Sequence, residues 1–110
     1  MSKSMEENFR RHIVQQITKN LLEFQILKLI SSQPMWGYKI KRQIEKASEL
    51  KVRHGTLYPL LNKLEREDLV QSQKQQYGKR KRKVYSITKK GKQYLQVYYD
   101  ILKEQIPTAE

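Results

Sequence analysis

The stretch Lys51–Leu69, KVRHGTLYPLLNKLEREDL, decides the fold. Thr56 is a residue type that caps helices, and Pro59 suits a first helical turn, where a missing N–H costs little. A helix that begins near Thr56 and ends near Asp68, which tolerates a left-handed conformation, has two contrasting faces at 100° per residue. One face carries Leu57, Leu60, Leu61 and Leu64, and the other carries Tyr58, Pro59, Asn62, Lys63 and Arg66. The first face is predicted to join a core, and the second to form a polar, basic surface.

The composition favours one compact domain with a polyanionic partner. The chain has 110 residues, and its 23 Lys and Arg against 11 Asp and Glu give a formal net charge of +12. Such an excess favours phosphate binding, because each neutralised phosphate releases counterions. Nucleic acid is the first candidate, and an acidic membrane surface the second.

Cysteine content and hydropathy indicate where in the cell the protein is expected. Cysteine is absent, which excludes disulfides and cysteine metal sites and is compatible with a reducing cytoplasm. The sequence has no apolar run of about 18 residues and no signal-peptide pattern. It therefore predicts a protein that neither crosses a membrane nor is secreted.

Residues 5–19 are predicted to form an amphipathic N-terminal helix, and residues 1–4 are expected to fray. The apolar residues recur every fourth position, at Met5, Phe9, Ile13 and Ile17. Asn20 and Glu23 have the spacing of a capping box, which marks either a new helix or a continuous helix passing through. Residues 21–30 are apolar in nearly every direction, as in a central helix.

Residues 37–48 are predicted to form the first helix of a helix-turn-helix. Ser31–Pro34 ends the preceding helix, and Ile40, Ile44 and Ala47 recur at helical spacing. The link from residue 47 to residue 53 is longer than a tight turn and is typical of winged variants.

Two strand-forming stretches, residues 70–75 and 84–87, flank a basic segment at residues 76–83. This pattern predicts a β-hairpin whose tip, the wing, holds a glycine followed by five bases. The bases are Lys79, Arg80, Lys81, Arg82 and Lys83. A solvated tip or a localisation-like tract is the simpler interpretation, but the position after a helix-turn-helix favours contact with the DNA backbone.

A last helix is predicted over residues 89–106, capped by Thr88 and stopped by Pro107. One face carries Leu95, Tyr98, Tyr99, Leu102 and Ile106. This stripe packs either on its own domain or on a second subunit. Little neighbouring chain remains to cover it, which favours a second subunit.

The sequence resembles the PadR-like family of transcriptional regulators. The family's Gly-Thr-Leu-Tyr-Pro run stands at residues 55–59 and is followed by Leu61, Leu64 and Glu65. The resemblance covers residues 20–95 and includes the segments 36–40 and 81–88 and Gly91. It implies a winged helix-turn-helix, with residues 56–67 as the DNA-recognition helix and dimerisation through the C-terminal helix, helped by the N-terminal one.

Some positions depart from the family pattern. Asp68 stands where a glycine is usual, and Val84 replaces the first of two common tyrosines. The last helix is short, which places the chain with the compact subgroup and puts an elaborate effector domain in doubt.

The predicted fold class is mainly α (α+β), a winged helix-turn-helix with a two-stranded antiparallel wing and a C-terminal dimerisation helix. The single domain, 1–110, divides into an N-terminal helix (5–19), the core (20–88) and the dimerisation helix (89–106). The chain is expected to bind double-stranded DNA sequence-specifically as a homodimer, most often as a repressor, in the nucleoid of the cytoplasm. The dimer interface is predicted to comprise Phe9, Ile13, Leu95, Tyr98, Tyr99, Leu102 and Ile106.

The DNA contacts are assigned to two elements. The helix 56–67 enters the major groove, and the wing, 76–83, lies on the backbone or in the minor groove. Contacts from the helix are expected from His54, Thr56, Tyr58, Pro59, Asn62 and Lys63, with phosphate contacts from Lys39, Arg42 and Arg53. The alternative is a non-specific architectural DNA-binding protein. Single-stranded RNA binding would need stacking aromatics on a sheet, and the hairpin offers few.

No motif indicates catalysis, a metal site or a cofactor. His12 and His54 lack a ligand partner at metal-site spacing. His54 suits a phosphate or base-edge contact, against a loop-capping role. Trp36 is interpreted as a packing residue in preference to a ligand-stacking one. A small-molecule effector is possible but not indicated: Tyr94, Tyr98 and Tyr99 could stack a flat compound between subunits, but the short last helix leaves little room for a cavity.

Overall fold

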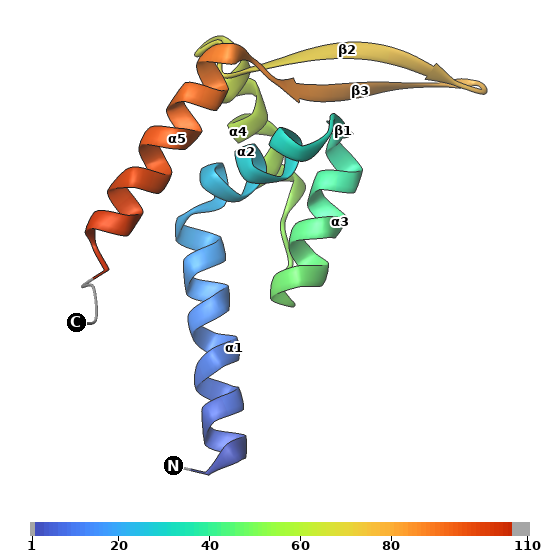
Figure 1. The fold of residues 1–110 in the computed structure, drawn as a ribbon. Helices are drawn as coiled ribbons and strands as arrows, with labels where there is room; N and C mark the ends of the chain where they lie inside the picture. The colour runs from blue at the N-terminus through green and yellow to red at the C-terminus, as the bar shows by residue number, and fades with distance from the viewer. Residues whose placement is uncertain (1, 107–110) are drawn as a thin grey trace.

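The computed structural model of the protein describes residues 2–106, which form five helices and a small antiparallel sheet (Figure 1). In chain order the elements are α1 (Lys3–Asn20), α2 (Leu22–Ser32), β1 (Met35–Trp36), α3 (Gly37–Ser48), α4 (His54–Arg66), β2 (Val70–Tyr77), β3 (Arg80–Ile87) and α5 (Lys89–Glu104). The molecule is 53 Å long. Figure 1 shows α1 and α5 projecting from one side of the core and the β2–β3 hairpin extending from another. This arrangement confirms the predicted winged helix-turn-helix.

The N-terminal helix begins earlier than predicted. The hydroxyl of Ser2 accepts a hydrogen bond of 3.2 Å from the backbone N–H of Met5, so Ser2 caps α1. Residues 2–4 therefore do not fray. A break at Leu21 separates α1 from α2, which settles the choice left open by the sequence, but no side chain caps the start of α2.

The core lies between α2, α3, α4 and the inner part of the sheet. Ile26 and Leu27 of α2 have no exposed surface, as expected for a central helix. The predicted apolar face of α4 is buried at Leu57, Leu61 and Leu64, whereas Leu60 at its edge is half-buried.

The sheet has one more strand than predicted. Its order is β1-β3-β2, with Trp36 paired to Val84 and Tyr77 paired to Arg80. Gly78 and Lys79 alone form the hairpin turn, and Gly78 has a φ of 60° at its first central position. Only Lys79 of the five bases therefore lies at the tip, because pairing with β2 extends β3 through the other four.

The helix α4 begins at His54, and the prediction that Thr56 caps it is wrong. Arg53 occupies the cap position, where its carbonyl accepts from the N–H groups of Thr56 and Leu57 at 3.0 Å each. Pro59 consequently lies in the second turn of the helix. Asp68, with a φ of 62°, adopts the left-handed conformation that was predicted at the helix end.

The cap of α5 is as predicted. The Oγ1 atom of Thr88 accepts from the N–H of Gly91 at 2.9 Å and donates to the carbonyl of Asp68 at 2.7 Å. The predicted stop at Pro107 lies outside the described residues. The cap joins the start of α5 to the turn after α4.

The aromatic stripe on α5 packs partly on its own domain, which is the alternative that the sequence did not favour. Tyr98 and Tyr99 pack on Phe24 of α2, with ring centroids 4.9 and 5.0 Å apart, and Leu95 is buried. Leu102 is also partly buried against the core. Helix α2 supplies the cover that sequence reasoning did not find. Of the five stripe residues, only Ile106, beyond the helix end, is mostly exposed.

Candidate nucleic-acid interface

The exposed face of α4 gathers most of the residues assigned to DNA recognition. Arg53 and His54 at its start are exposed, and so are Thr56, Pro59, Asn62 and Lys63 along the helix. Lys63 pairs with Glu67 at 3.5 Å, one turn further on. The face therefore offers a mixture of imidazole, hydroxyl, amide and ammonium groups.

Tyr58 is half-buried and serves as a packing residue. Its ring stacks on His54 with centroids 4.4 Å apart. It also lies against Gly37, where a Cβ atom would come within 2.7 Å of the Tyr58 hydroxyl oxygen. A glycine is needed at residue 37 because any side chain would displace this ring. Tyr58 thus joins the start of α4 to the start of α3.

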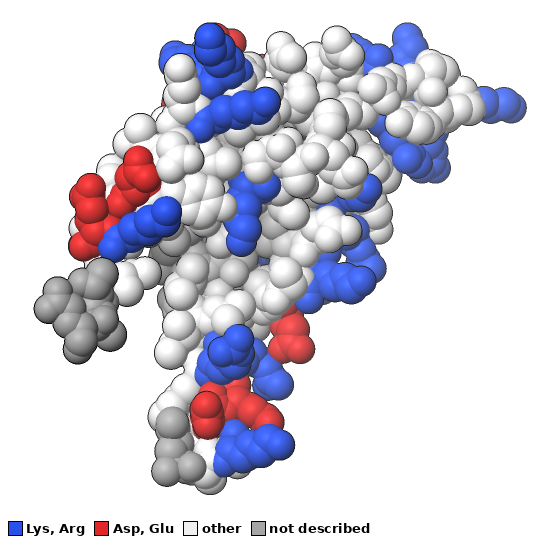
Figure 2. Space-filling model, viewed as in Figure 1, with Lys and Arg blue, Asp and Glu red and all other residues white. Residues whose placement is uncertain are grey.

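The bases of the wing project from both faces of the sheet. Arg80 and Arg82 alternate with Lys81 and Lys83 along β3, so the two pairs lie on opposite faces. The face with Lys83 continues into the core at Tyr85. Figure 2 shows Lys and Arg side chains along the hairpin and along the α3 side of the molecule. The expectation of five bases gathered at a tip is therefore wrong.

Lys83 is partly engaged within the protein. Its Nζ atom lies 3.3 Å from Oε1 of Glu65 in α4, and the hydroxyl of Ser72 donates to the other carboxylate oxygen. The Ser72 hydrogen bond, together with the nearby Lys83 charge, lowers the pKa of Glu65, against a smaller opposing effect of burial. These contacts connect the inner end of the wing to α4.

Arg82 makes a contact that the sequence did not reveal. Its guanidinium carbon lies 3.8 Å from the ring centroid of Trp36 and 5.0 Å from that of Tyr77. Trp36 is half-buried and stacks on this cation. It is therefore a packing residue, but it packs against the wing and is not part of the buried core. The contact depends on the pairing of β1 with β3. Strand β1 has only two residues, so the sequence shows no alternation from which this pairing could be predicted.

A groove of about 400 Å³ separates the wing from α4. It is lined by Trp36, Gly37, Tyr58, Arg80, Lys81, Arg82 and Lys83. Aromatic rings and four cations around one open groove suit an extended polyanion. The assigned phosphate contacts on α3 are Lys39, which is half-buried, and Arg42, which is exposed.

A second, apolar surface lies on α5, away from the wing. Tyr94, Val97 and Ile101 are 37%, 56% and 50% exposed. They line an apolar groove of about 390 Å³ whose other walls are Leu21, Tyr98 and Leu102. The hydroxyl of Tyr94 donates to Glu23 at 3.2 Å. Burial, followed by the Glu23 charge, raises the pKa of Tyr94 to about 12.

The apolar face of α1 is also uncovered. Phe9 and Ile13 are 53% and 54% exposed, and Met5 and Ile17 are exposed to a similar degree.

Within residues 2–106, no helix is both long and apolar enough to cross a membrane. In the same part of the chain, no three His, Cys, Asp or Glu side chains cluster as a metal ion would require.

Comparison with known proteins assigns the chain to a family. The sequence model of the transcriptional regulator PadR-like family matches residues 26–97. A PadR-like transcription factor from Bacteroides fragilis is 32% identical, with a TM-score of 0.73, over 84% of this chain and 90% of that one. A PadR-like transcriptional regulator from Bacillus cereus is 31% identical, with a TM-score of 0.72, over 81% and 87% of the two chains.

A third similar structure contains DNA. Bacillus subtilis PadR in complex with operator DNA is 30% identical, with a TM-score of 0.66, over 82% of this chain and 51% of that one. No curated protein shows a significant match. The chain belongs to the PadR-like family of transcriptional regulators.

Proposed function

We propose that the protein is a repressor that binds specific double-stranded DNA sequences as a homodimer on the nucleoid in the cytoplasm. It is not an enzyme, since its family consists of transcriptional regulators. Helix α4 would enter the major groove, and the wing would lie on the backbone or in the minor groove. The observation that carries the proposal is the basic groove whose walls are four cations of β3 and the residues Trp36, Gly37 and Tyr58.

Helix α4 and the wing suit different tasks. His54, Thr56 and Asn62 on α4 are groups that can distinguish base edges by hydrogen bonding. Lys79 and Lys81 on the wing are exposed cations, which suit phosphates of any sequence. The complex of Bacillus subtilis PadR with operator DNA supports this use of the fold. We therefore expect α4 to select the sequence and the wing to supply affinity.

The homodimer would cover the apolar surfaces of α1 and α5. Phe9 and Ile13 remain in the proposed interface, because both are about half exposed. On α5 the proposed contacts shift to Val97 and Ile101, since Leu95 and the tyrosine pair already pack on α2. Burial of a Leu, Ile or Val side chain contributes roughly 1.5–3 kcal/mol, and two-fold symmetry counts each contact twice. A second copy would also close the apolar groove beside Tyr94.

Competition binding tests specificity. Duplexes selected from a random pool would be labelled, and displacement by the same sequence would be compared with displacement by its scrambled form. A regulator should bind the scrambled duplex on the order of 10³-fold more weakly. Equal competition by both duplexes would instead favour a non-specific architectural protein.

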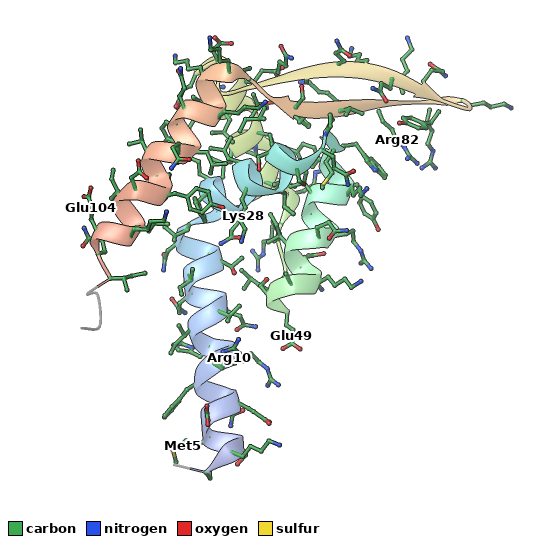
Figure 3. The ribbon with its side chains drawn as sticks, viewed as in Figure 1. Met5, Arg10, Lys28, Glu49, Arg82 and Glu104 are labelled. Carbon is green, nitrogen blue, oxygen red and sulfur yellow. The ribbon has the colours of Figure 1, made fainter. Side chains whose placement is uncertain are left out.

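Paired variants test the division of roles. Lys79→Ala and Lys81→Ala should weaken selected and scrambled duplexes alike and reduce the salt slope by up to about 0.9 per lost phosphate contact. Asn62→Ala should reduce discrimination between the two duplexes. Lys103→Ala is the charge-matched control, because Lys103 lies in the last turn of α5, whose end at Glu104 is far from the wing in Figure 3. A wing variant that changed the preferred sequence would reverse the assignment.

A further inference from the structure

Arg82 lies where the sheet narrows from three strands to two. The last pair of β1 with β3 is Trp36 with Val84, and beyond it β3 has only β2 beside it. Arg82 projects from the same sheet face as Val84, two residues further out, which places its guanidinium 3.8 Å from the Trp36 ring centroid. Figure 3 shows Arg82 on the side of the hairpin that faces α3. An isolated two-stranded ribbon is marginally stable, so a contact at this point limits its movement.

A second aromatic ring lies near Arg82. The ring centroid of Tyr77 is 5.0 Å from the guanidinium carbon. Tryptophan is the strongest aromatic partner for a cation, and a planar guanidinium stacks better than an ammonium. Within residues 2–106, no carboxylate forms an ion pair with Arg82. The aromatic rings are therefore the contacts that hold this side chain.

Trp36 and its neighbour also contact the recognition helix. Trp36 occupies the cap position of α3, and the next residue, Gly37, lies directly under the Tyr58 ring of α4. Residues 36 and 37 thus touch the wing through Arg82 and the recognition helix through Tyr58. These two residues therefore connect the outer part of the wing to the start of α4, in addition to the contacts of Glu65 with Lys83 and Ser72 at its inner end.

We propose that Arg82 is a positioning residue, whose stacking on Trp36 holds the wing at the angle at which it meets DNA together with α4. This inference rests on the proposed DNA-binding function and assigns Arg82 a role other than a phosphate contact. A phosphate contact needs the charge, which lysine retains, and does not involve Trp36. A positioning role needs the planar guanidinium and the indole ring.

Conservative variants separate the two roles. Arg82→Lys and Trp36→Leu should each weaken binding to a selected duplex about five- to tenfold, the size expected for one cation–π contact. The salt slope should stay unchanged, because neither variant removes a charge. The double variant should bind no worse than either single variant, since both remove the same contact. Trp36→Phe, which keeps a ring, should retain most of the affinity.

The matched control is Arg10→Lys, an exposed arginine on α1 far from the wing in Figure 3. It should bind DNA as the wild type does. A wild-type affinity for both Arg82→Lys and Trp36→Leu would overturn the proposal. So would a reduced salt slope in Arg82→Ala combined with full rescue by lysine, because that result defines a simple phosphate contact.

Fluorescence tests the stack without DNA. Trp36 is the single tryptophan of the sequence, so its emission reports on this site alone. Arg82→Lys should increase acrylamide quenching of Trp36, whereas Arg80→Lys should not. Unchanged quenching in Arg82→Lys would overturn the stack itself. A wild-type chain that binds no duplex would instead overturn the proposed function. The quenching comparison needs no DNA, so it still shows in that case whether Arg82 stacks on Trp36.

Discussion

The Nζ atom of Lys83 lies 3.3 Å from the Oε1 atom of Glu65, so that strand β3 is joined to the last turns of α4. The Ser72 hydroxyl of β2 donates to the same carboxylate. One acidic side chain of α4 therefore contacts both strands of the wing. Lys83 is less available to a phosphate than Lys79 or Lys81, because its charge already has a partner.

Glu65→Gln should destabilise the protein in a pH-dependent way. We expect a loss of about 0.5–1 kcal/mol in the free energy of unfolding near neutral pH, because the pair is partly exposed. The Ser72 hydrogen bond and Lys83 lower the pKa of Glu65 below the ordinary value of 4.5. The contribution is therefore present above that value and is lost as the pH falls through the lowered pKa. Urea unfolding at about pH 7 and at about pH 3 measures both effects.

Glu67→Gln is the control for this prediction, since it removes the exposed pair with Lys63 and leaves the wing contacts intact. It should change stability by a few tenths of a kcal/mol. A difference between Glu65→Gln and wild type that persisted unchanged at low pH would contradict the role given to the ionised carboxylate.

Gly91→Ala should destabilise the protein by about 2–3 kcal/mol through overpacking. A Cβ atom at residue 91 would lie 2.0 Å from the backbone oxygen of Leu69 and 2.7 Å from a side-chain carbon of Ile87. The start of α5 could not then pack against the turn after α4. Thermal or urea unfolding measures the loss.

Gly55→Ala is the matched control, because a Cβ atom there meets nothing within 4 Å. Gly55 lies inside α4, so alanine should stabilise the helix by roughly 0.5–1 kcal/mol. Equal stabilities of the two variants would show that the close approach at Gly91 is absent in solution.

The sequence predicted those parts of the fold that depend on local periodicity and chemistry. The buried face of α4, the bounds of α3 and the Thr88 cap follow from residue spacing within one segment. The left-handed Asp68 follows from side-chain chemistry in the same way. These features need no knowledge of distant contacts.

The sequence failed where a distant segment decides the outcome. Thr56 has the chemistry of a cap, but α4 begins two residues earlier, at His54, and Arg53 occupies the cap position. Tyr98 looked uncovered because nothing in its own helix indicates that Phe24 lies against it. The partner of Arg82 was hidden for the same reason, since β1 is too short to show alternation. The division of α4 into a buried and an exposed face could thus be predicted, whereas the contact between Arg82 and Trp36 could not.

Val97→Asp should convert the proposed homodimer into monomers without unfolding them. Val97 is 56% exposed and contributes to the apolar face that a second copy would cover. The variant loses that burial twice across a two-fold axis and places two carboxylates in an apolar interface. Dimer affinity should fall by about 3 kcal/mol or more, at least about a hundredfold, while the unfolding free energy of the monomer changes little.

Two further variants and one measurement complete the test. Leu95→Ala removes a buried side chain and should lower the stability of each subunit by about 2–5 kcal/mol. Lys92→Asp, about 140° around α5 from Val97, should leave the dimer intact. Sedimentation velocity at micromolar concentration distinguishes the species. A two-fold dimer should bind an operator whose half-sites lie about one helical turn apart. A wild-type chain that sediments as a monomer would contradict both the interface and this expectation.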